Sequence, residues 1–405
     1  MADLNSTPSS NRVHIGFFGN RNAGKSSLVN AVTNQKISIV SDVLGTTTDP
    51  VQKSMELLPI GPVLIIDTPG FDDVGVLGEE RVKRTKEILA KTDVAILIVD
   101  GTVGKTATDN ELIEIFKAKN VPYIVVYNKC DIKEIEVAEE NEIAVSATEG
   151  TNINELKEKI GSLAKANENE KVICSDLIKK DDFVILVCPI DESAPKNRMI
   201  LPQMQTIRDI LDGDGVCITV KETELENALK ALGKKPKLVI TDSQAFHIVK
   251  DIVPNDIYLT SFSILMARYK GFLDVSVNGA KALKELNDGD TILISEGCTH
   301  HRQCNDIGTV KLPKMIEKFT GKKFNYKWTS GGEFPDNLDG VSLVIHCGGC
   351  MLNEQAMVSR RNTAIALNVP FTNYGIVIAM INGILDRSLE VLGGDGTCVQ
   401  LIANS

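Results

Sequence analysis

The stretch GNRNAGKS, residues 19–26, constrains the fold of this chain more than any other part of it. The apolar run VHIGFFG, residues 13–19, ends on the first glycine of this stretch, and SLVNAVT follows the stretch. A strand, a glycine-rich loop and a helix in this order form the P-loop pattern in its required context. The glycines let backbone N–H groups cradle a phosphate, the Lys25 ammonium adds positive charge, and the Ser26 hydroxyl can ligate Mg²⁺. The sequence therefore predicts a nucleotide-phosphate site at one end of an α/β sheet.

Two further stretches complete the phosphate end. DTPG, residues 67–70, follows the apolar run VLIID, and GTTTD, residues 45–49, lies between it and the P-loop. Asp67 would hold Mg²⁺ through water, and the Gly70 N–H would contact the γ-phosphate. Thr47 is the threonine that we expect to close on Mg²⁺ when a γ-phosphate is present.

Two loops predict that the base is guanine. NKCD, residues 128–131, follows the strand-like run YIVVYN, and SAT, residues 146–148, follows EIAV. The Asp131 carboxylate can accept both N–H donors of guanine N1 and N2, which adenine lacks, and a backbone N–H of the SAT loop can donate to guanine O6. The predicted ligand is therefore GTP and not ATP.

Together, these five motifs resemble the GTPase domain of the TrmE/Era family over about 150 residues. The resemblance implies catalytic roles for Lys25, Thr47 and Gly70, and Mg²⁺ ligation by Ser26 and Thr47. It implies a set of nucleotide contacts, which is Asn20, Arg21, Asn22, Ala23, Gly24, Lys25, Ser26, Ser27, Thr47, Asp67, Gly70, Asn128, Lys129, Asp131, Ser146 and Ala147.

The mechanism implied by that resemblance is a slow one. Phe71 stands where Ras-like GTPases carry the glutamine that orients the attacking water, as in the hydrophobic-substituted GTPases. In that group an asparagine at the position of Asn22 helps to bind K⁺ in place of an arginine finger. Potassium-stimulated hydrolysis is expected, and packing within the loop is the alternative role of Asn22.

At 405 residues, the whole chain is long enough for two or three domains, each with a core of its own. Strand-like apolar runs alternate with amphipathic helical stretches throughout, which predicts α/β architecture in every segment. We expect a disordered tail at 1–12, a GTP-binding domain at 13–167, a parallel α/β dimerisation domain at 168–271 and an α/β cluster-binding domain at 272–405.

Composition narrows the class of protein. The net charge of −10 argues against a general nucleic-acid surface, and neither an export signal nor a membrane span is apparent, so a soluble cytoplasmic protein is expected. The nine cysteines are then expected to be reduced. Clustered ones are better explained as metal ligands than as disulfides.

Three cysteines and two histidines lie in two short stretches of the third segment. CTH, residues 298–300, follows the strand-like run TILISE, and HCGGC, residues 346–350, follows VSLVI. Because open α/β sheets place ligands at the carboxyl ends of their strands, the two stretches are expected to form one site. Cys304 is either a fourth ligand or a surface thiol, and the surface thiol is the preferred interpretation. Cys174, Cys188, Cys217 and Cys398 are interpreted as buried apolar side chains.

The spacing alone leaves the metal open. Two cysteines with two histidines, or three with one, would make a tetrahedral zinc site, whereas three thiolates with an open fourth position suit a [4Fe–4S] cluster. The size of the domain favours iron, since a domain this large should not need zinc to fold.

Over essentially the whole chain, the GTPase motifs with the CxH…HCxxC set resemble the HydF family of [FeFe]-hydrogenase maturation GTPases. The resemblance implies that Cys298, Cys347 and Cys350 hold a [4Fe–4S] cluster, with His300 or His346 as fourth ligand or in hydrogen bonds around it. Water, Glu296 or Asp191 are the other candidates for the fourth position.

This resemblance also implies partners. The first is a second copy of the chain, which would form a homodimer through the middle domain. The others are two radical-SAM maturases and apo-[FeFe]-hydrogenase, to which the protein would deliver a diiron precursor. Nucleic acid and membranes are not expected as partners. The alternative is a zinc-stabilised TrmE/Era-like GTPase that acts on tRNA or in ribosome assembly.

Overall fold

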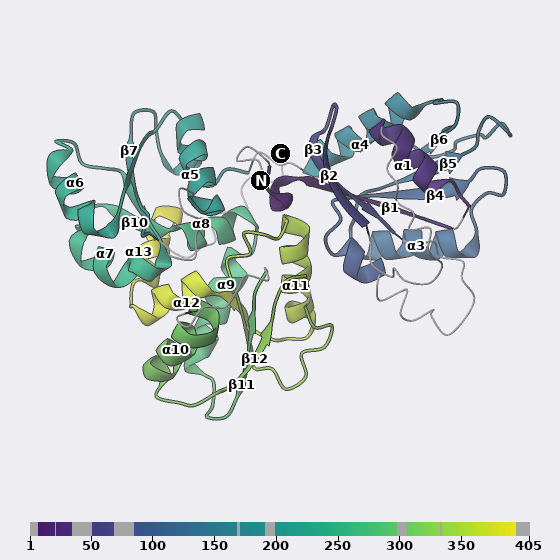
Figure 1. Cartoon of the computed structure of the whole chain (residues 1–405). Coiled ribbons are helices and arrows are strands. Elements are labelled where there is room, and N and C mark those ends of the chain that lie inside the picture. Colours follow the sequence, from purple (N-terminus) through teal and green to yellow (C-terminus); the bar gives the residue numbers. More distant parts are fainter. Residues whose placement is uncertain are drawn as a thin grey trace. The chain divides into compact units, whose positions relative to one another are not determined.

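The computed structural model describes most of the chain, which divides into two compact units. The described residues are 7–20, 22–34, 51–68, 85–167, 171–190, 199–297, 306–332 and 334–393. One unit comprises Met1–Glu170 with Asn353–Ala356, and the other comprises Lys171–Leu352 with Met357–Ser405. Figure 1 shows the helices and strands of both units, coloured along the sequence.

The first unit is built on a six-stranded sheet with the order β2-β3-β1-β4-β5-β6. All neighbouring strands are parallel except β2, which pairs antiparallel with β3. The strands are β1 Val13–Gly19, β2 Val51–Leu57, β3 Gly61–Asp67, β4 Val94–Asp100, β5 Tyr123–Asn128 and β6 Glu142–Ala144. The central strands are continuous apolar runs because helices cover both of their faces.

Helices cover the two faces of this sheet. They are α1 Lys25–Thr33, α3 Ala107–Ala118 and α4 Ile153–Asn167. Successive side chains of β1 point to opposite faces, so Phe17 packs with apolar residues of α1 and α4, and Phe18 packs with residues of α3. Figure 1 shows α1 and α4 on one side of the sheet and α3 on the other. Because β1, β3 and β5 run in the same direction, their carboxyl ends lie at one edge of the sheet.

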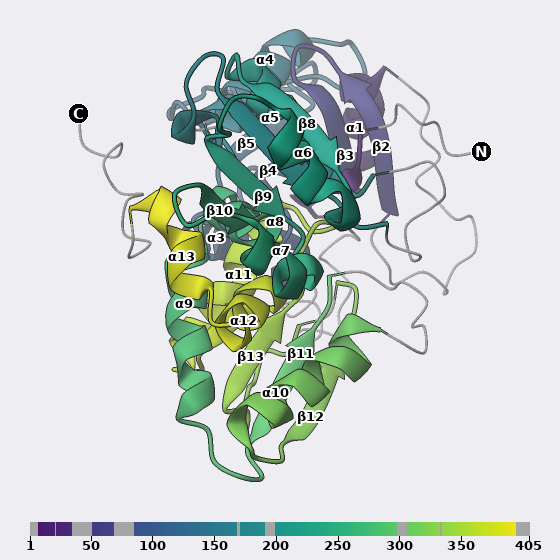
Figure 2. The same ribbon diagram turned by 90° about the vertical axis from the view of Figure 1, so that its left-hand side faces the viewer.

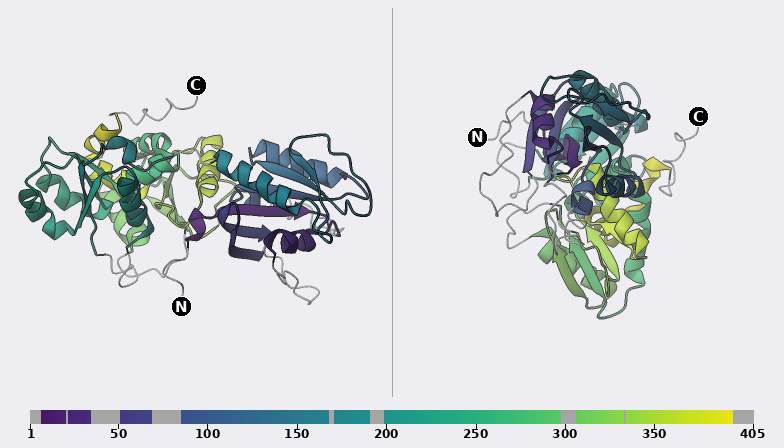
Figure 3. Two further views of the ribbon diagram at one scale, coloured as in Figure 1. Left: turned by 90° about the horizontal axis from the view of Figure 1, so that it is seen from above. Right: turned by 90° about the vertical axis from the view of Figure 1, so that its right-hand side faces the viewer.

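The second unit contains two four-stranded parallel sheets. The first has the order β10-β9-β7-β8, and the second has the order β12-β11-β13-β14. The strands of the first are β7 Phe183–Val187, β8 Val216–Val220, β9 Leu238–Thr241 and β10 Tyr258–Ser261. Those of the second are β11 Thr291–Ser295, β12 Asn325–Thr329, β13 Leu343–His346 and β14 Phe371–Asn373. Figure 2 labels β11, β12 and β13 side by side, and the sheets can also be followed in Figure 3.

Nine helices are described in this unit. They are α5 Leu201–Asp212, α6 Leu225–Ala231, α7 Phe246–Ile252, α8 Phe262–Tyr269, α9 Leu273–Lys281, α10 Leu312–Thr320, α11 Glu354–Ala366, α12 Tyr374–Ile381 and α13 Leu385–Leu389. A π-helical turn at Ile307–Lys311 leads into α10. Within the described part of the chain, no helix is both long enough and apolar enough to cross a membrane.

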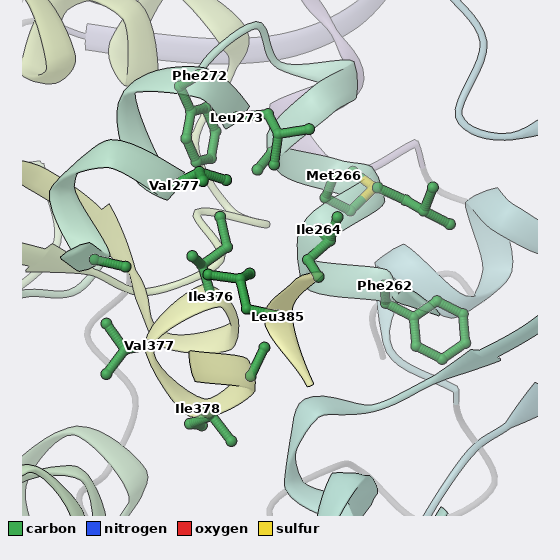
Figure 4. Close-up of a cluster of buried hydrophobic side chains, with 14 of the residues drawn as sticks. Phe262, Ile264, Met266, Phe272, Leu273, Val277, Ile376, Val377, Ile378 and Leu385 are labelled. Atoms are coloured by element: carbon green, nitrogen blue, oxygen red, sulfur yellow. The ribbon is translucent and has the colours of Figure 1, made fainter. Parts of the chain in front are cut away.

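One hydrophobic core joins the two sheets of the second unit. Figure 4 shows Phe262, Ile264 and Met266 of α8 beside Ile376 of α12 and Leu385 of α13. The contact is close, since a Cβ on Gly375 of α12 would lie 2.1 Å from Ser263 Cβ. The segment before residue 271 and the segment after it therefore pack as one body, with α8 at the junction.

Candidate functional site

The P-loop has the local geometry that its sequence predicts. The loop leaves β1 at Gly19 and enters α1 at Lys25, and both Asn22 (φ 68°) and Gly24 (φ 88°) adopt left-handed backbone conformations. A side chain at Gly24 is excluded, because its Cβ would lie 2.1 Å from Asn128 Nδ2. Lys25 Nζ donates to Gly19 O at 3.1 Å, which closes the loop on itself. The turn thus presents the start of α1, with its N–H groups, as an anion site.

Asn128 ties this loop to the loop that is predicted to contact guanine. Its Nδ2 donates to Ala23 O at 3.0 Å, and its Oδ1 accepts from Ala147 N at 3.1 Å. The side chain is only 3% exposed, so both bonds are shielded from water. The Asn128 side chain therefore fixes the position of the phosphate end of the site relative to the base end.

Asn20 is anchored in a similar way to the first turn of α3. Its Nδ2 donates to Thr106 Oγ1 at 3.0 Å and lies 3.3 and 3.4 Å from the two carboxylate oxygens of Asp109. Asp109 also caps α3 by accepting the Thr106 N–H at 2.9 Å. The predicted contact residue Asn20 thus uses its side chain to position the loop.

The base end of the site leaves one carboxylate accessible. Lys129 Nζ pairs with Asp100 Oδ2 at 2.5 Å, whereas Asp131 is exposed. Ser146 is buried, and its Oγ accepts from Glu149 N at 3.0 Å. The arrangement leaves the Asp131 carboxylate accessible, and its contact with guanine stays a prediction.

Asp67 is a buried carboxylate at the end of β3, in register with Phe17 of β1. Among the described residues, its Oδ1 has no hydrogen-bond partner. Burial raises the pKa of Asp67 to about 6, while Lys25 and the Thr68 N–H act in the opposite direction. An unsatisfied buried carboxylate oxygen near the P-loop lysine suits the coordination sphere of Mg²⁺, which prefers oxygen ligands, and Ser26 would supply the hydroxyl.

The substitution Asp67→Asn should stabilise the nucleotide-free protein. The folded state holds the Asp67 proton more tightly than the unfolded chain, where the pKa is about 3.8. Wild-type stability therefore falls as the pH rises from about 4 to 6. The neutral amide removes this cost, so the free energy of unfolding at pH 8 should rise by up to about 3 kcal/mol. Urea unfolding at pH 8 and pH 4 checks this, and an equal effect at both pH values would contradict it.

Three predicted residues of the nucleotide site lie outside the described residues: Arg21, Thr47 and Gly70. Phe71, which stands in the place of a water-orienting glutamine, lies outside them as well. Their roles stay predictions. The structure brings together Lys25 at the start of α1, Asp67 at the end of β3 and Asn128 at the end of β5.

The second candidate site lies where β11 and β13 end. Ser295 and His346 are partners in the parallel register, and Cys347 N donates to Ser295 O at 2.8 Å. Cys347 Sγ accepts two backbone hydrogen bonds, from Gly297 N at 3.1 Å and from Gly349 N at 3.4 Å. Such bonds favour a thiolate, which is the form that binds metals.

The loop of this site turns tightly. Gly349 has a φ of 61°, and a Cβ there would lie 2.5 Å from Met357 Sδ. Cys350 is half-buried three residues after Cys347, and α11 begins at Glu354. Cys298, His300, Cys304 and Asp191 lie outside the described residues, although Gly297, which contacts Cys347, directly precedes Cys298 in the sequence. Within the described ranges no set of three metal-ligating side chains is assembled.

His346 is fully buried and uses both ring nitrogens within the protein. Nδ1 lies 2.7 Å from Cys347 O, and Nε2 lies 2.8 Å from an Arg360 nitrogen. A carbonyl only accepts and a guanidinium only donates, so the ring carries its proton on Nδ1. Burial, together with Arg360, lowers the pKa of His346 to about 3, which agrees with a neutral ring.

Glu296 adds a buried carboxylate beside the same strand end. It is 3% exposed, and its Oε1 accepts from Tyr374 OH at 3.2 Å. The packing is tight there, because a Cβ on Gly308 would lie 2.6 Å from Glu296 Oε1. Of the cysteines predicted to be buried apolar side chains, Cys174 and Cys188 are buried in the core and Cys217 packs against it. Cys398 lies outside the described residues.

Sequence reasoning missed two cations of this second site. Arg360, on α11, donates to His346, and Lys270, at the end of α8, donates to two carbonyls of the cysteine loop. Neither residue lies in a recognisable motif. In the sequence, each is only a charged residue in an amphipathic helical stretch.

Three family models match the chain. A model described as 50S ribosome-binding GTPase matches residues 14–129, one described as hydrogen maturase F dimerization domain matches residues 173–271, and one described as hydrogen maturase F tetramerization domain matches residues 274–391.

Curated relatives share part of the chain. GTPase Der of Wolinella succinogenes is 38% identical over 165 residues, which is 36% of this chain and 35% of the relative. The tRNA modification GTPase MnmE of Aquifex aeolicus is 33% identical over 165 residues, which is 40% of this chain and 36% of the relative. The chain thus matches about a third of the length of these relatives.

Solved structures give likenesses of similar extent. A probable GTP-binding protein engB is 26% identical with a TM-score of 0.31, and covers 38% of this chain and 99% of its own. Aquifex aeolicus Era bound to GDP and AlF₄⁻ is 21% identical with a TM-score of 0.32, and covers 54% of this chain and 98% of its own.

The sheet order, the phosphate loop and the guanine loops define the first unit as a P-loop GTPase domain. The matches to the rest of the chain are specific to one kind of GTPase. The chain belongs to the hydrogen maturase F family, known as HydF, and carries both oligomerization domains of that family. The third segment, predicted only as a cluster domain, is thus also matched as a tetramerization domain.

Proposed function

We propose that this protein is a GTP-hydrolysing scaffold that binds a [4Fe–4S] cluster and assembles or delivers the diiron precursor of the active-site cluster to apo-[FeFe]-hydrogenase. Its cluster ligands would be Cys298, Cys347 and Cys350. The two radical-SAM maturases would supply the precursor, and the apo-hydrogenase would receive it. Membership of the hydrogen maturase F family supports this assignment.

The observation that carries the proposal is the environment of Cys347. Its sulfur accepts two backbone N–H groups at the carboxyl end of β13, and Cys350 follows in the same turn. Hydrogen bonds to the sulfurs are among the features by which proteins set the reduction potential of an iron–sulfur cluster. The donor set thus suits the cluster, which would supply an iron site open to an external ligand.

His346 would act next to the cluster and not as its ligand. Its Nε2 is held by Arg360 at 2.8 Å, and its Nδ1 proton is directed at Cys347 O. Moving the ring onto iron would leave the buried guanidinium without that acceptor, which is costly. The fourth position is therefore assigned to His300, water or a carboxylate such as Glu296.

Anaerobic reconstitution of the full chain tests this function. Iron, acid-labile sulfide and zinc are measured per protomer, and EPR spectra are recorded after dithionite reduction. About four irons with matching sulfide and a reduced-cluster signal are expected. One zinc per protomer without iron would overturn the proposal in favour of a structural zinc site.

The GTPase reaction is proposed to be slow and stimulated by K⁺. The sequence places Phe71 after DTPG where a water-orienting glutamine would stand, and it provides Asn22, which the structure holds at the exposed turn of the P-loop. The rate of phosphate release should be higher in KCl than in NaCl at equal ionic strength. Equal rates in the two salts would assign Asn22 to loop packing alone.

GTP and the cluster site are proposed to communicate through binding partners. A nucleotide shifts only those equilibria for which its two forms differ in affinity. Affinities of the GTP-bound and GDP-bound protein for each maturase and for apo-hydrogenase measure this directly. Equal affinities would remove the switch from the account and leave the scaffold role in place.

A further inference from the structure

Two buried cations flank the cysteine loop of the second unit, and the first of them comes from α8. Lys270 is 6% exposed, and its Nζ donates to Gly349 O at 2.6 Å and to Leu352 O at 3.0 Å. Gly349 lies between the two cysteines, and Leu352 precedes α11. One ammonium group thus bridges the two ends of the turn that carries Cys350.

The second cation comes after the cysteine loop in the sequence and holds the strand end that precedes the loop. Arg360 is 4% exposed and donates to Ser295 Oγ at 3.3 Å, to His346 Nε2 at 2.8 Å and to Gly331 O at 2.6 Å. These three acceptors are neutral. Burial lowers the pKa of Arg360 to about 10, while Cys347 acts in the opposite direction.

Burying such charges is costly unless a negative charge lies nearby. The acceptors of Arg360 satisfy its hydrogen bonds, and its guanidinium carbon lies 5.5 Å from the centre of the Phe334 ring, but none of these partners carries a negative charge. The positive charges of Lys270 and Arg360 could compensate an anionic group at Cys347, whose sulfur already accepts two backbone N–H hydrogen bonds. Thiolates that bind iron bring negative charge to that place.

Lys270 also links two parts of the chain. It directly follows α8, whose apolar side chains pack in the core shared by both sheets (Figure 4). It lies one residue before the end of the segment that the dimerization model matches. The residue after it, Gly271, turns the chain with a φ of 69°. A shift of α8 would therefore move the cation that holds the cysteine loop.

We propose that Lys270 and Arg360 are positioning residues that hold the cysteine loop and compensate the negative charge of the cluster, with Lys270 connecting the dimerization segment to the cluster site. The inference rests on the proposed iron–sulfur function. Reduction adds one electron from dithionite to the cluster, so removing a nearby positive charge should make the reduction potential more negative.

The test compares Lys270→Met and Arg360→Met with the control Lys281→Met in the full chain. Lys281 is an exposed lysine at the end of α9, in the same unit. Each protein is reconstituted, its iron content is measured, and its potential is determined by dithionite titration followed by EPR. Lys270→Met and Arg360→Met should both have a more negative reduction potential than the wild type. The control Lys281→Met should keep the wild-type potential.

The charge-retaining variants Lys270→Arg and Arg360→Lys decide the case in which a methionine variant binds no iron or fails to fold. Recovery of iron binding with a potential near that of the wild type supports the proposal. Unchanged potentials in loaded Lys270→Met and Arg360→Met would overturn it, as would persistent loss of iron in folded Lys270→Arg and Arg360→Lys. Absence of iron from the wild type would instead refute the proposed function itself.

Discussion

Lys25→Met is expected to lower the rate of GTP hydrolysis by about 10²–10³-fold, since an oriented charge at the developing phosphate charge is lost. In the structure its Nζ is held by Gly19 O at 3.1 Å, which places the ammonium within the P-loop. Phosphate release gives the rate, and a fluorescent GTP analogue gives the affinity, which should weaken as well.

The matched control for this prediction is Lys119→Met. Lys119 is an exposed lysine at the end of α3, away from the P-loop in sequence and outside the predicted nucleotide contacts. The control should hydrolyse GTP at the wild-type rate. A Lys25→Met protein that remained within a few-fold of wild type would show that another group supplies the charge.

The substitution Cys347→Ala should abolish iron binding, from about four irons per protomer to nearly none, because a cluster with two thiolates is not expected to persist. Cys347 is half-buried and alanine keeps the turn, so the fold should survive. Iron and sulfide analysis after anaerobic reconstitution measures the loss.

Cys217→Ala is the control for that experiment. Cys217 lies on β8, in the other sheet of the unit, and packs against the core. It should bind as much iron as the wild type. Equal iron in Cys347→Ala and the wild type would remove Cys347 from the ligand set.

The fold was predictable where strands are continuous apolar runs. VLIID, VAILIVD and LVIH are buried on both faces, and the structure has them as β3, β4 and β13. The strands that pattern reasoning missed are polar or short. β2 is an exposed-edge strand with the sequence VQKSMEL, β12 is an edge strand with the sequence NYKWT, and β14 has only three residues. Backbone pairing with a neighbour decides such strands, and a single sequence carries little trace of it.

The candidate sites were predictable to different depths. The motifs predicted that Lys25, Asp67 and Asn128 would converge, because they follow strands of one parallel sheet. They did not reveal that Asn128 holds the P-loop, since the bond to Ala23 O joins residues 105 positions apart. Lys270 and Arg360 were missed for a related reason: burial of a helical cation depends on packing that brings distant segments together.

The most direct test of the scaffold account is activation of apo-[FeFe]-hydrogenase by the loaded protein. The chain is isolated after coexpression with the two maturases, mixed with apo-hydrogenase, and hydrogen production is measured beside that of an identically prepared Cys298→Ala variant. The account predicts activity with the wild type and none above background with Cys298→Ala. Equal activation by both proteins would contradict it.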